Sequence, residues 1–358
     1  MSGGVDSSVA AALLADERRA AGATSDEVIG VWMRLHPGGG EGFEMRRSCC
    51  SPDAHDDARR VAQLIGIPFF ALNLEESFGR RVIDAFADAY LAGSTPNPCQ
   101  ACNQYIKFDE LLKRGLAAYG ADLVATGHYA RTTWRDGSWH LLRAADADKD
   151  QTYFLWSLDQ SQLARTRFPL GELTKPQVRR IAAELELPTA DKPESQEICF
   201  VPAGDYRELL AERRGYLGEP GPIRDGSGTE LGTHTGYAHY TVGQRHGLGV
   251  ASSEALYVRS IDPATNTVVV GRRDEIATAR VEADGARFIA GEPPAERFRA
   301  TLRIRHRGAE VPCEVTVHSD ERLLIETEVP VWAPAAGQAA VLYRGDECLG
   351  GGRIARPA

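Results

Sequence analysis

A glycine- and serine-rich string, SGGVDSS, stands directly before a segment whose alanines and leucines predict a helix from Ser7 to Arg18. Two adjacent glycines let the backbone turn tightly, so that its N–H groups and the helix N-terminus can point at an anion. The carboxylate of Asp6 in this string would repel a bare phosphate, but its presence is explained if Mg²⁺ bridges it to pyrophosphate. No Gly-Lys-Ser/Thr follows, so the string is not a Walker A loop. A glycine-rich helix cap is the alternative to a nucleotide-phosphate site, which we predict at Ser2, Gly3, Gly4, Val5, Asp6, Ser7 and Ser8.

Three cysteines stand in contexts that suit thiol chemistry. Cys99 and Cys102 form a C-x-x-C pair that follows a Pro-Asn-Pro turn and precedes a helix predicted from Ile106. A thiol near a helix N-terminus has a lowered pKa and is a good nucleophile. Cys199 lies at the end of the helical half of the chain. These three cysteines could act as plain thiols, which is the interpretation that we favour. The alternative is a [4Fe–4S] cluster held by Cys99, Cys102 and Cys199, with one iron left open.

The remaining cysteines give weaker signals. No second C-x-x-C pair exists, so spacing alone hardly supports a closed four-cysteine zinc site. We expect Cys49 and Cys50 to pack or cap, and Cys313 and Cys348 to lie in a core. Seven cysteines in a chain of this size do not form a disulfide scaffold.

Arginines alternate with apolar residues in the string ERFRATLRIRHRG. Alternate residues of a strand face opposite sides, so one face should be apolar and buried. That face holds Phe298, Ala300, Leu302 and Ile304. The other face holds Arg297, Arg299, Arg303, Arg305 and Arg307. Arginine forks suit phosphate oxygens, so the pattern predicts an RNA-contacting strand, with a solvated strand face as the alternative.

Strand and helix patterns alternate through the first half of the chain. Strands are predicted at 27–33, 67–74 and 122–126, the second of them buried. Helices are predicted at 53–65, 78–91, 106–119 and, after the capping box Thr174-Lys-Pro-Gln, up to residue 186. This alternation predicts an α/β fold with a doubly wound parallel sheet covered on both faces.

The pattern changes near residue 200. Positions 215–250 are rich in glycine, and a hairpin follows at ALYVRSI-DPATN-TVVVG. Short strands broken by glycine and proline run from about 276. We therefore predict a catalytic domain at 1–200, a small α+β central domain at 201–275 and a C-terminal antiparallel β-barrel at 276–358.

Length and composition bound the possible functions. The chain has 358 residues, 43% of them hydrophobic and 25% charged, which excludes collagen-like and mostly disordered classes. The net charge of −9 argues against RNA binding over the whole surface but allows a local basic patch. Of 41 basic residues, five are lysines, and all five lie between positions 107 and 192. No segment predicts a signal peptide or a membrane helix, so we expect a cytoplasmic protein with no membrane contact.

Taken together, these strings resemble the bacterial tRNA-specific 2-thiouridylases along nearly the whole chain. The matching strings, in order, are MSGGVDSSVAA, CCSPDAHDDARRVAQLIGIPF, TPNPCQACNQYIKF, ATGHYAR, KDQTYFLW, ICFVP, YTVGQRHGLG and GQAAVLY–GGGRI. The resemblance implies an ATP-pyrophosphatase fold and an enzyme that uses ATP and Mg²⁺ to replace O2 of the wobble uridine with sulfur. It implies tRNA and a persulfide sulfur-donor protein as partners, and we expect a monomer. In that fold a strand precedes the loop, so we expect the first strand to be missing here.

The resemblance also assigns roles to single residues. It implies ATP contacts at the loop, Met33 and Gly127, a catalytic thiol at Cys102 and a persulfide at Cys199, with a Cys102–Cys199 disulfide as an alternative state. The target base would lie near Asn97, Pro98 and Cys99. Position 99 is commonly aspartate in this family, so a carboxylate for acid/base chemistry is missing there. The implied tRNA contacts are His128, Lys149, Asp150, Gln151, Arg305, His306 and Gln338.

Two rival functions remain open at this point. One is an adenylating pyrophosphatase that acts on a small molecule, which would need neither paired cysteines nor an arginine-faced barrel. The other is an RNA-binding protein that has lost catalysis.

Overall fold

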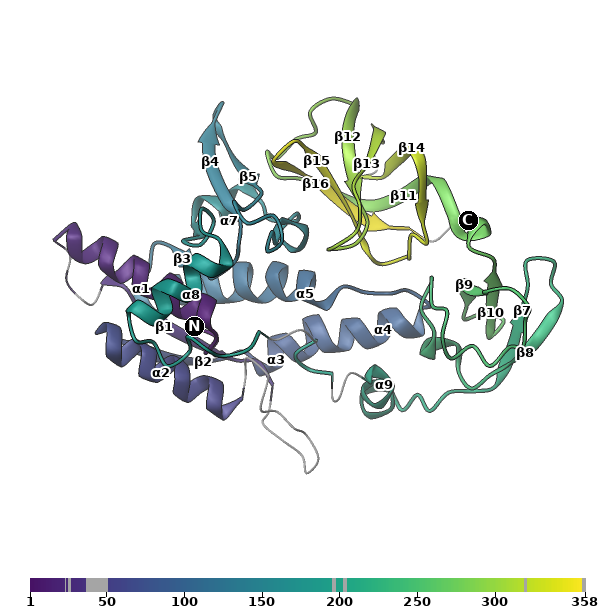
Figure 1. The fold of residues 1–358 in the computed structure, drawn as a ribbon, viewed down its shortest axis with the longest axis horizontal. Helices are drawn as coiled ribbons and strands as arrows, with labels where there is room; N and C mark the ends of the chain where they lie inside the picture. Colours follow the sequence, from purple (N-terminus) through teal and green to yellow (C-terminus); the bar gives the residue numbers. More distant parts are fainter. Residues whose placement is uncertain are drawn as a thin grey trace. The chain divides into compact units, whose positions relative to one another are not determined.

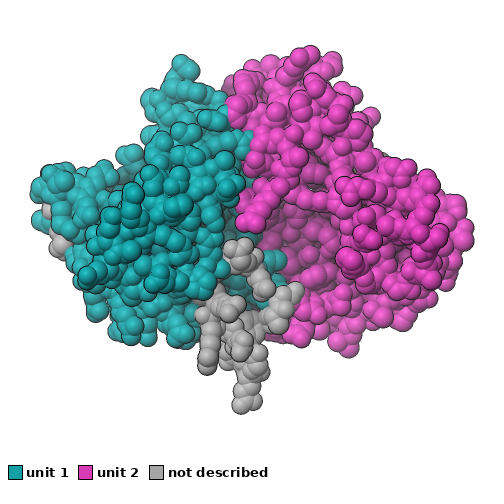
Figure 2. All heavy atoms as spheres, in the orientation of Figure 1, with its two compact units in different colours: residues 1–83, 99–204, 346–348 teal, residues 84–98, 205–345, 349–358 magenta. Residues whose placement is uncertain are grey.

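The computed structural model describes residues 1–22, 24, 27–36, 51–194, 198–201, 205–318 and 321–355; Cys49 and Cys50 lie outside them. The chain forms two compact units, coloured separately in Figure 2. Unit 1 comprises residues 1–83, 99–204 and 346–348, and unit 2 comprises residues 84–98, 205–345 and 349–358. The segment 84–98 therefore packs with the C-terminal half, although its neighbours in sequence belong to unit 1.

Unit 1 has the predicted α/β character. Its first elements are α1 (Val5–Ala20), β1 (Gly30–Arg34), α2 (Pro52–Ile65), β2 (Phe69–Asn73) and α3 (Glu75–Phe78). After the segment 84–98 come α5 (Pro98–Ala101), the π-helix η4 (Cys102–Glu110), α6 (Leu111–Tyr119) and β3 (Val124–Ala125). The rest are β4 (Arg131–Arg135), β5 (Ser138–Leu142), η5 (Thr152–Phe154), α7 (Gln160–Ala164), β6 (Thr166–Arg167) and α8 (Lys175–Glu184).

Local sequence signals explain the helix ends in this unit. Ser51 caps α2 by accepting a hydrogen bond from the Ala54 N–H at 3.1 Å, and Gly66 ends the helix in the left-handed conformation. The predicted capping box of α8 is present between Thr174 and Gln177. Helices α1, α2 and α8 bury alanines, valines and isoleucines in one common core.

Strands β1, β2, β3 and β6 of unit 1 pair in parallel as the alternation predicted, in two two-stranded sheets, whereas β4 and β5 form an antiparallel pair. Strand β1 pairs in parallel with β2, and β3 pairs in parallel with β6. One detail of the prediction was wrong, because the strand at 67–74 is not buried: Phe70 is 42% exposed. Among the described strands, β2 has β1 as its neighbour on one side only, which leaves its other edge uncovered.

Unit 2 begins with α4 (Ala85–Leu91), preceded by the π-helix η3 (Gly79–Asp84), which spans the unit boundary. Helix α9 (Tyr206–Arg214) follows, and then a four-stranded sheet in the order β8-β7-β10-β9. Its strands are β7 (Gly221–Arg224), β8 (Glu230–His234), β9 (Tyr257–Asp262) and β10 (Thr267–Gly271). The predicted hairpin is the antiparallel pair β9–β10.

The C-terminal strands form the predicted antiparallel barrel (Figure 1). They are β11 (Ala277–Phe288), β12 (Arg297–Arg303), β13 (Val311–Val317), β14 (Leu323–Trp332), β15 (Ala339–Arg344) and β16 (Glu347–Ile354). They pair in the order β11-β14-β13-β12-β15-β16, and pairing of β11 with β16 closes the barrel. Cys313 and Cys348 are buried, which confirms their predicted place in a core.

Candidate active site

The loop before α1 is shaped by a close backbone approach. Gly3 has φ +69°, and a Cβ there would lie 2.2 Å from the Ala54 carbonyl oxygen, so only glycine fits. The hydroxyls of Ser7 and Ser8 donate to the Gly4 carbonyl at 3.0 and 2.9 Å. The first N–H groups of a helix have no partner within the helix and favour an anion. The loop and the N-terminus of the 16-residue α1 thus have the features on which the predicted phosphate site rests, and that site stays a prediction.

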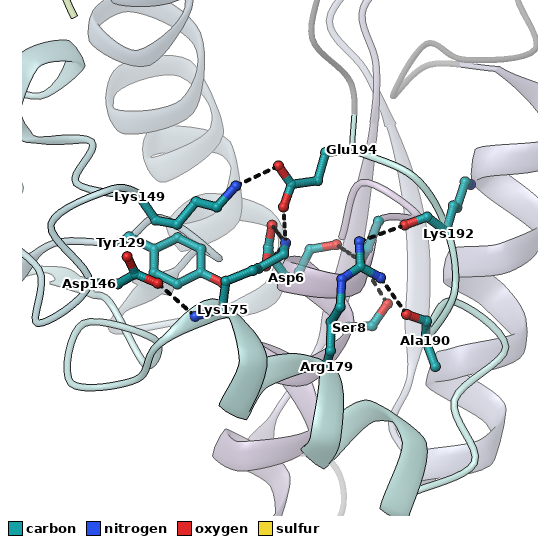
Figure 3. A network of polar contacts seen from close by, with 12 residues as sticks. Asp6, Ser8, Tyr129, Asp146, Lys149, Lys175, Arg179, Ala190, Lys192 and Glu194 are labelled. Carbon is teal, nitrogen blue, oxygen red and sulfur yellow. Dashed lines mark hydrogen bonds and ion pairs between the residues drawn. The ribbon is translucent and has the colours of Figure 1, made fainter. Parts of the chain in front are cut away.

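Asp6, the carboxylate in this loop, is paired with a lysine (Figure 3). The Lys175 ammonium donates to Oδ1 at 2.7 Å and to Oδ2 at 2.9 Å, and the Tyr129 hydroxyl donates to Oδ1 at 2.8 Å. Lys175 is the first residue of α8, and its side chain is 9% exposed. Burial and then the Asp6 charge raise the pKa of Tyr129, so its hydroxyl keeps its proton and remains a donor.

The same ammonium holds a second acid. Lys175 Nζ lies 2.7 Å from Glu194 Oε1, and Lys149 Nζ lies 2.8 Å from Glu194 Oε2. Burial opposes ionisation of Glu194, but the hydrogen bonds and charges of the two lysines outweigh it and lower its pKa to about 2. Two carboxylates and two ammonium groups thus form one charge-balanced network, which contains Asp6 from the loop (Figure 3).

The segment at residues 190–194 is fastened to the loop by a second set of contacts. Lys192 Nζ donates to the Gly3 carbonyl at 2.9 Å and to Asp57 Oδ2 at 2.6 Å. Arg179 of α8 donates to the carbonyl of Ala190 at 2.7 Å and to that of Lys192 at 3.3 Å. The Lys192 side chain therefore ties this segment to the loop, and Arg179 ties its backbone to α8.

Two further predicted ATP contacts lie at strand ends. Met33 is partly buried at the carboxyl end of β1. Gly127 follows β3, and a Cβ there would lie 2.8 Å from the Asp6 carbonyl carbon and from the Ser7 nitrogen. The turn after β3 thus closes directly on the backbone of the loop, which explains the glycine.

Cys99 and Cys102 lie in helical segments, where the sequence predicted an exposed turn followed by a helix from Ile106. Cys99 is exposed in α5, and Cys102 is partly buried as the first residue of the π-helix η4. π-helical turns occur often at functional sites. Cys199 is partly buried in a turn whose next residue, Phe200, packs edge-on against Phe78 with ring centroids 5.7 Å apart. Within the described residues, no three or more His, Cys, Asp or Glu side chains are arranged to hold a metal ion.

Two of the residues implied as tRNA contacts in unit 1 are buried. Asp150 is 3% exposed, and both its oxygens accept hydrogen bonds from the Thr152 hydroxyl, at 3.0 and 2.8 Å. His128 is 8% exposed, with Nδ1 2.8 Å from the Thr126 hydroxyl. Burial and then the Lys107 charge hold the pKa of His128 well below its usual range, so the ring is neutral. Asp150 also accepts hydrogen bonds from the Ala144 and Thr152 N–H groups at 3.3 and 3.4 Å and so supports the backbone around it, whereas the His128 ring contacts side chains.

Their neighbours are partly accessible. Gln151 Oε1 accepts a hydrogen bond from the Tyr129 N–H at 2.9 Å, which ties the KDQ string to the ATGHYAR string. Lys149 is 28% exposed and is engaged by Glu194. A direct contact with RNA is therefore sterically simplest for Lys149.

In unit 2, the residues implied as tRNA contacts are Arg305, His306 and Gln338, which lie in turns between strands of the C-terminal barrel. Arg305 donates to the Ala333 carbonyl at 3.0 Å and lies 5.0 Å above the centre of the Trp332 ring. His306 is partly buried beside it. Gln338 Nε2 donates to the carbonyls of Thr95 at 3.0 Å and Pro96 at 3.4 Å. Besides Cys99, two residues were predicted to lie near the target base: Asn97 is partly buried, and Pro98 is buried.

The arginine string differs from its prediction in two respects, the first of which is that β12 ends at Arg303, so that Ile304, Arg305 and Arg307 lie beyond the strand. Its apolar face is buried as predicted, at Phe298, Leu302 and Ile304. The arginine face, however, meets acids from outside the string: Arg297 pairs with Glu314, and Arg303 pairs with Glu310 at 2.5 Å. The sequence string contains no acid between its arginines, and the neutralising glutamates come from the chain around β13.

Several residues of the site were not predicted from the sequence. They are Asp57, Tyr129, Lys175, Lys192 and Glu194. The advance signals were weak: all five lysines lie in one stretch of an arginine-rich chain, and Asp57 and Tyr129 lie in two of the strings that carry the family resemblance. Lys175 was predicted only as part of a capping box.

Comparison with known proteins covers almost the whole chain. A family model described as tRNA methyl transferase HUP domain matches residues 1–203. Those described as tRNA methyl transferase PRC-barrel domain and Aminomethyltransferase beta-barrel domain match residues 208–272 and 278–354. Within the described residues, no helix has the length and apolar character needed to cross a bilayer.

Individual relatives are similar over their full length. The tRNA-specific 2-thiouridylase MnmA of Carboxydothermus hydrogenoformans is 49% identical, with 99% of this chain and 96% of that protein aligned. The proteins of the same name from Geobacter metallireducens and Chloroflexus aurantiacus are each 48% identical. The first alignment covers 99% of this chain and 95% of the relative, and the second covers 100% of this chain and 97% of the relative.

Among solved structures, the U34-tRNA thiolase NcsA from Methanococcus maripaludis with its [4Fe–4S] cluster is 19% identical. The superposition covers 61% of this chain and 63% of the NcsA chain, with a TM-score of 0.34. This similarity is too low to support any inference. The sequence relatives are decisive instead: at 48% to 49% identity over nearly its entire length, the chain belongs to the family of tRNA-specific 2-thiouridylases.

Proposed function

We propose that this chain is a tRNA sulfurtransferase that activates the wobble uridine with ATP and transfers sulfur to it from a cysteine persulfide. Family membership carries the thiolation of tRNA. One observation supports the finer mechanism: Lys192 and Glu194 fasten the segment that leads to Cys199 onto the anion-binding loop. We further propose domain bounds of 1–200, 201–275 and 276–358.

The first step activates an unreactive carbonyl. C2 of uridine is a poor electrophile, and oxide is a poor leaving group, so transfer of AMP from ATP to O2 with release of pyrophosphate makes that oxygen able to leave. The loop backbone and the N-terminus of α1 are suited to the phosphates, because Gly3 and Gly127 permit the close approach. Lys175 and Lys192 supply positive charge beside the loop.

Magnesium is proposed at Asp6, with one condition set by the structure. Both oxygens of this carboxylate accept hydrogen bonds from Lys175, so the metal would have to displace that ammonium. When bound, the ion would supply neutralisation of charge on the leaving pyrophosphate. Lys175 would then keep Glu194 as a partner.

The second step delivers sulfur. The terminal sulfur of a Cys199 persulfide attacks C2, the C–O bond breaks, and AMP leaves with the oxygen. Attack of the Cys102 thiolate on the remaining Cys199 sulfur breaks the S–S bond, leaves sulfur on the uridine and forms a Cys102–Cys199 disulfide. Alternatively, Cys102 first reduces the persulfide, and the released hydrosulfide attacks C2. In both routes an external thiol reductant and a persulfide donor protein restore Cys199.

An iron–sulfur route through Cys99, Cys102 and Cys199 has less support. The described residues contain no group of three such ligands arranged for a metal.

We also propose that tRNA contacts Lys149 in unit 1 and Arg305 and His306 in unit 2, with the target base near Asn97, Pro98 and Cys99. Lys149 and Arg305 present cationic groups that are partly exposed. Asp150 and Gln151 would act through the backbone that they support, and His128 through the side chains that it contacts. A tRNA substrate implies that the protein acts in the cytoplasm.

The decisive experiment incubates the protein with ATP, Mg²⁺, unmodified tRNA and a persulfide donor, and then analyses the wobble nucleoside by mass spectrometry. We expect a uridine in which one oxygen is exchanged for sulfur, in an ATP-dependent manner. A methylated nucleoside, which the descriptions of the matching family models would suggest, or an unchanged uridine would refute the proposal.

A further inference from the structure

The residues 92–98, here called the strap, connect α4 with the turn that carries Cys99 and Cys102. The strap packs with unit 2, as does the barrel turn at residues 335–338. The Thr95 N–H donates to the Ala336 carbonyl at 2.7 Å. Gln338 Nε2 donates to the carbonyls of Thr95 and Pro96 at 3.0 and 3.4 Å. Three hydrogen bonds thus fix the backbone just before Asn97-Pro98-Cys99.

A glycine allows this contact to be close. Gly337 has φ +89°, and a Cβ there would lie 3.2 Å from Ser94 Cβ and from the Thr95 carbonyl oxygen. A side chain at residue 337 would therefore strain the left-handed backbone and require the strap to shift by a few tenths of an ångström.

The other end of the strap is also held within unit 2. Arg214 of α9 donates to the two oxygens of Asp88 in α4 at 2.6 and 3.1 Å. Tyr90 and Tyr206 stack with centroids 4.2 Å apart, and the Tyr237 hydroxyl donates to the Leu91 carbonyl at 2.9 Å. A strap fixed at both ends can impose its position on the residues that follow it.

We propose that Gln338 is a positioning residue: with Gly337, it fixes the backbone that presents the Cys99–Cys102 turn. This inference rests on the proposed catalytic role of Cys102. A primary amide has two N–H donors, and two strap carbonyls engage this one, so the amide nitrogen is committed to the strap. That commitment distinguishes the proposal from a role for Gln338 as a simple tRNA contact.

The test uses a variant that removes no group able to bind RNA. Gly337→Ala crowds the strap, whereas Gly345→Ala, in the same barrel and also at positive φ (+57°), has no neighbour within 4 Å and serves as the matched control. Gln338→Met keeps the side-chain length but loses the donors. For each protein we would measure the alkylation rate of Cys102 without tRNA, the tRNA Kd, and kcat at saturating tRNA, with thermal unfolding to verify folding.

For Gly337→Ala and Gln338→Met we expect kcat to fall about tenfold, since displacements near 1 Å cost up to about a hundredfold. The Cys102 alkylation rate should change severalfold, the tRNA Kd should stay the same, and Gly345→Ala should match the wild type. A weakened tRNA Kd with wild-type kcat and alkylation would overturn the proposal and leave Gln338 as a tRNA contact. If the wild type itself produces no thiouridine, the proposed function fails, while the alkylation comparison still tests the positioning.

Discussion

Replacing Gly127 with alanine tests whether the turn after β3 sets the position of the nucleotide loop. The new Cβ would lie 2.8 Å from the Asp6 carbonyl carbon, 2.8 Å from the Ser7 nitrogen and 3.0 Å from the Asp6 carbonyl oxygen. All three are backbone atoms, so no rotamer change relieves the overlap. Ordinary contact distances of about 3.5 Å or more require the loop to move by roughly 0.5–1 Å.

Such a movement has a predictable cost. Overpacking of this kind destabilises by about 1–3 kcal/mol. A misplacement near 1 Å in a catalytic loop lowers the rate by up to about a hundredfold, so we expect a loss of about 10- to 100-fold for Gly127→Ala. The added Cβ meets only backbone atoms of Asp6 and Ser7, so the tRNA Kd should stay unchanged.

The assay is tRNA-dependent release of pyrophosphate from ATP, measured with saturating tRNA. Gly115→Ala is the matched control, because a Cβ there has no neighbour within 4 Å, and alanine in a helix is about 1 kcal/mol more favourable than glycine. The control should keep full activity and gain stability. Wild-type pyrophosphate release by Gly127→Ala would show that the loop does not depend on this contact, and the steric reasoning would be refuted.

Three other predictions follow from the site. Asp6→Asn should abolish adenylation but leave tRNA affinity near wild type in a filter-binding assay; normal thiolation would reduce Asp6 to a helix cap. Cys199→Ser should adenylate tRNA without accepting persulfide sulfur, and Cys102→Ser should lose thiolation while Cys99→Ser keeps much of it; equal losses at all three, with about four bound irons, would favour a cluster. Glu194 has its pKa lowered from 4.5 to about 2, so its stabilising contribution is complete above pH 4.5 and is lost as the pH falls toward 2. Denaturant unfolding should therefore show Glu194→Gln less stable by about 1–2 kcal/mol at pH 7, with the difference shrinking below pH 4.5; a difference that is independent of pH would contradict the ion pair.

Local signals in the sequence were sufficient for much of the fold. The α2 helix ends at Gly66 and begins at Pro52 after Ser51, where capping chemistry and left-handed backbone leave little freedom. The alternation of Phe298 and Leu302 with arginines predicted which side of β12 is buried, because side chains in a strand alternate strictly. These features depend on neighbours within a few positions.

Features that depend on distant residues could not be predicted in the same way. Asp6 meets Lys175 across 169 positions, and no periodicity in the sequence encodes that pair. The arginine face of β12 seemed free of acids because Glu310 and Glu314 belong to the chain around the next strand. The burial of Asp150 beneath its own turn likewise depends on a local backbone shape that composition does not reveal.

A carboxylate inside an anion-binding loop is an apparent contradiction that the structure resolves electrostatically. Lys175 cancels the charge of Asp6, so the loop N–H groups face no net repulsion of a phosphate. Because the same ammonium also holds Glu194, the two acids are coupled through one cation. Removing Asp6, Lys175 or Glu194 alters the environment of the other two. The effects of single substitutions at these residues on the free energy of unfolding will therefore not be additive. The loop carboxylate, the lysine and Glu194 therefore act as one electrostatic unit.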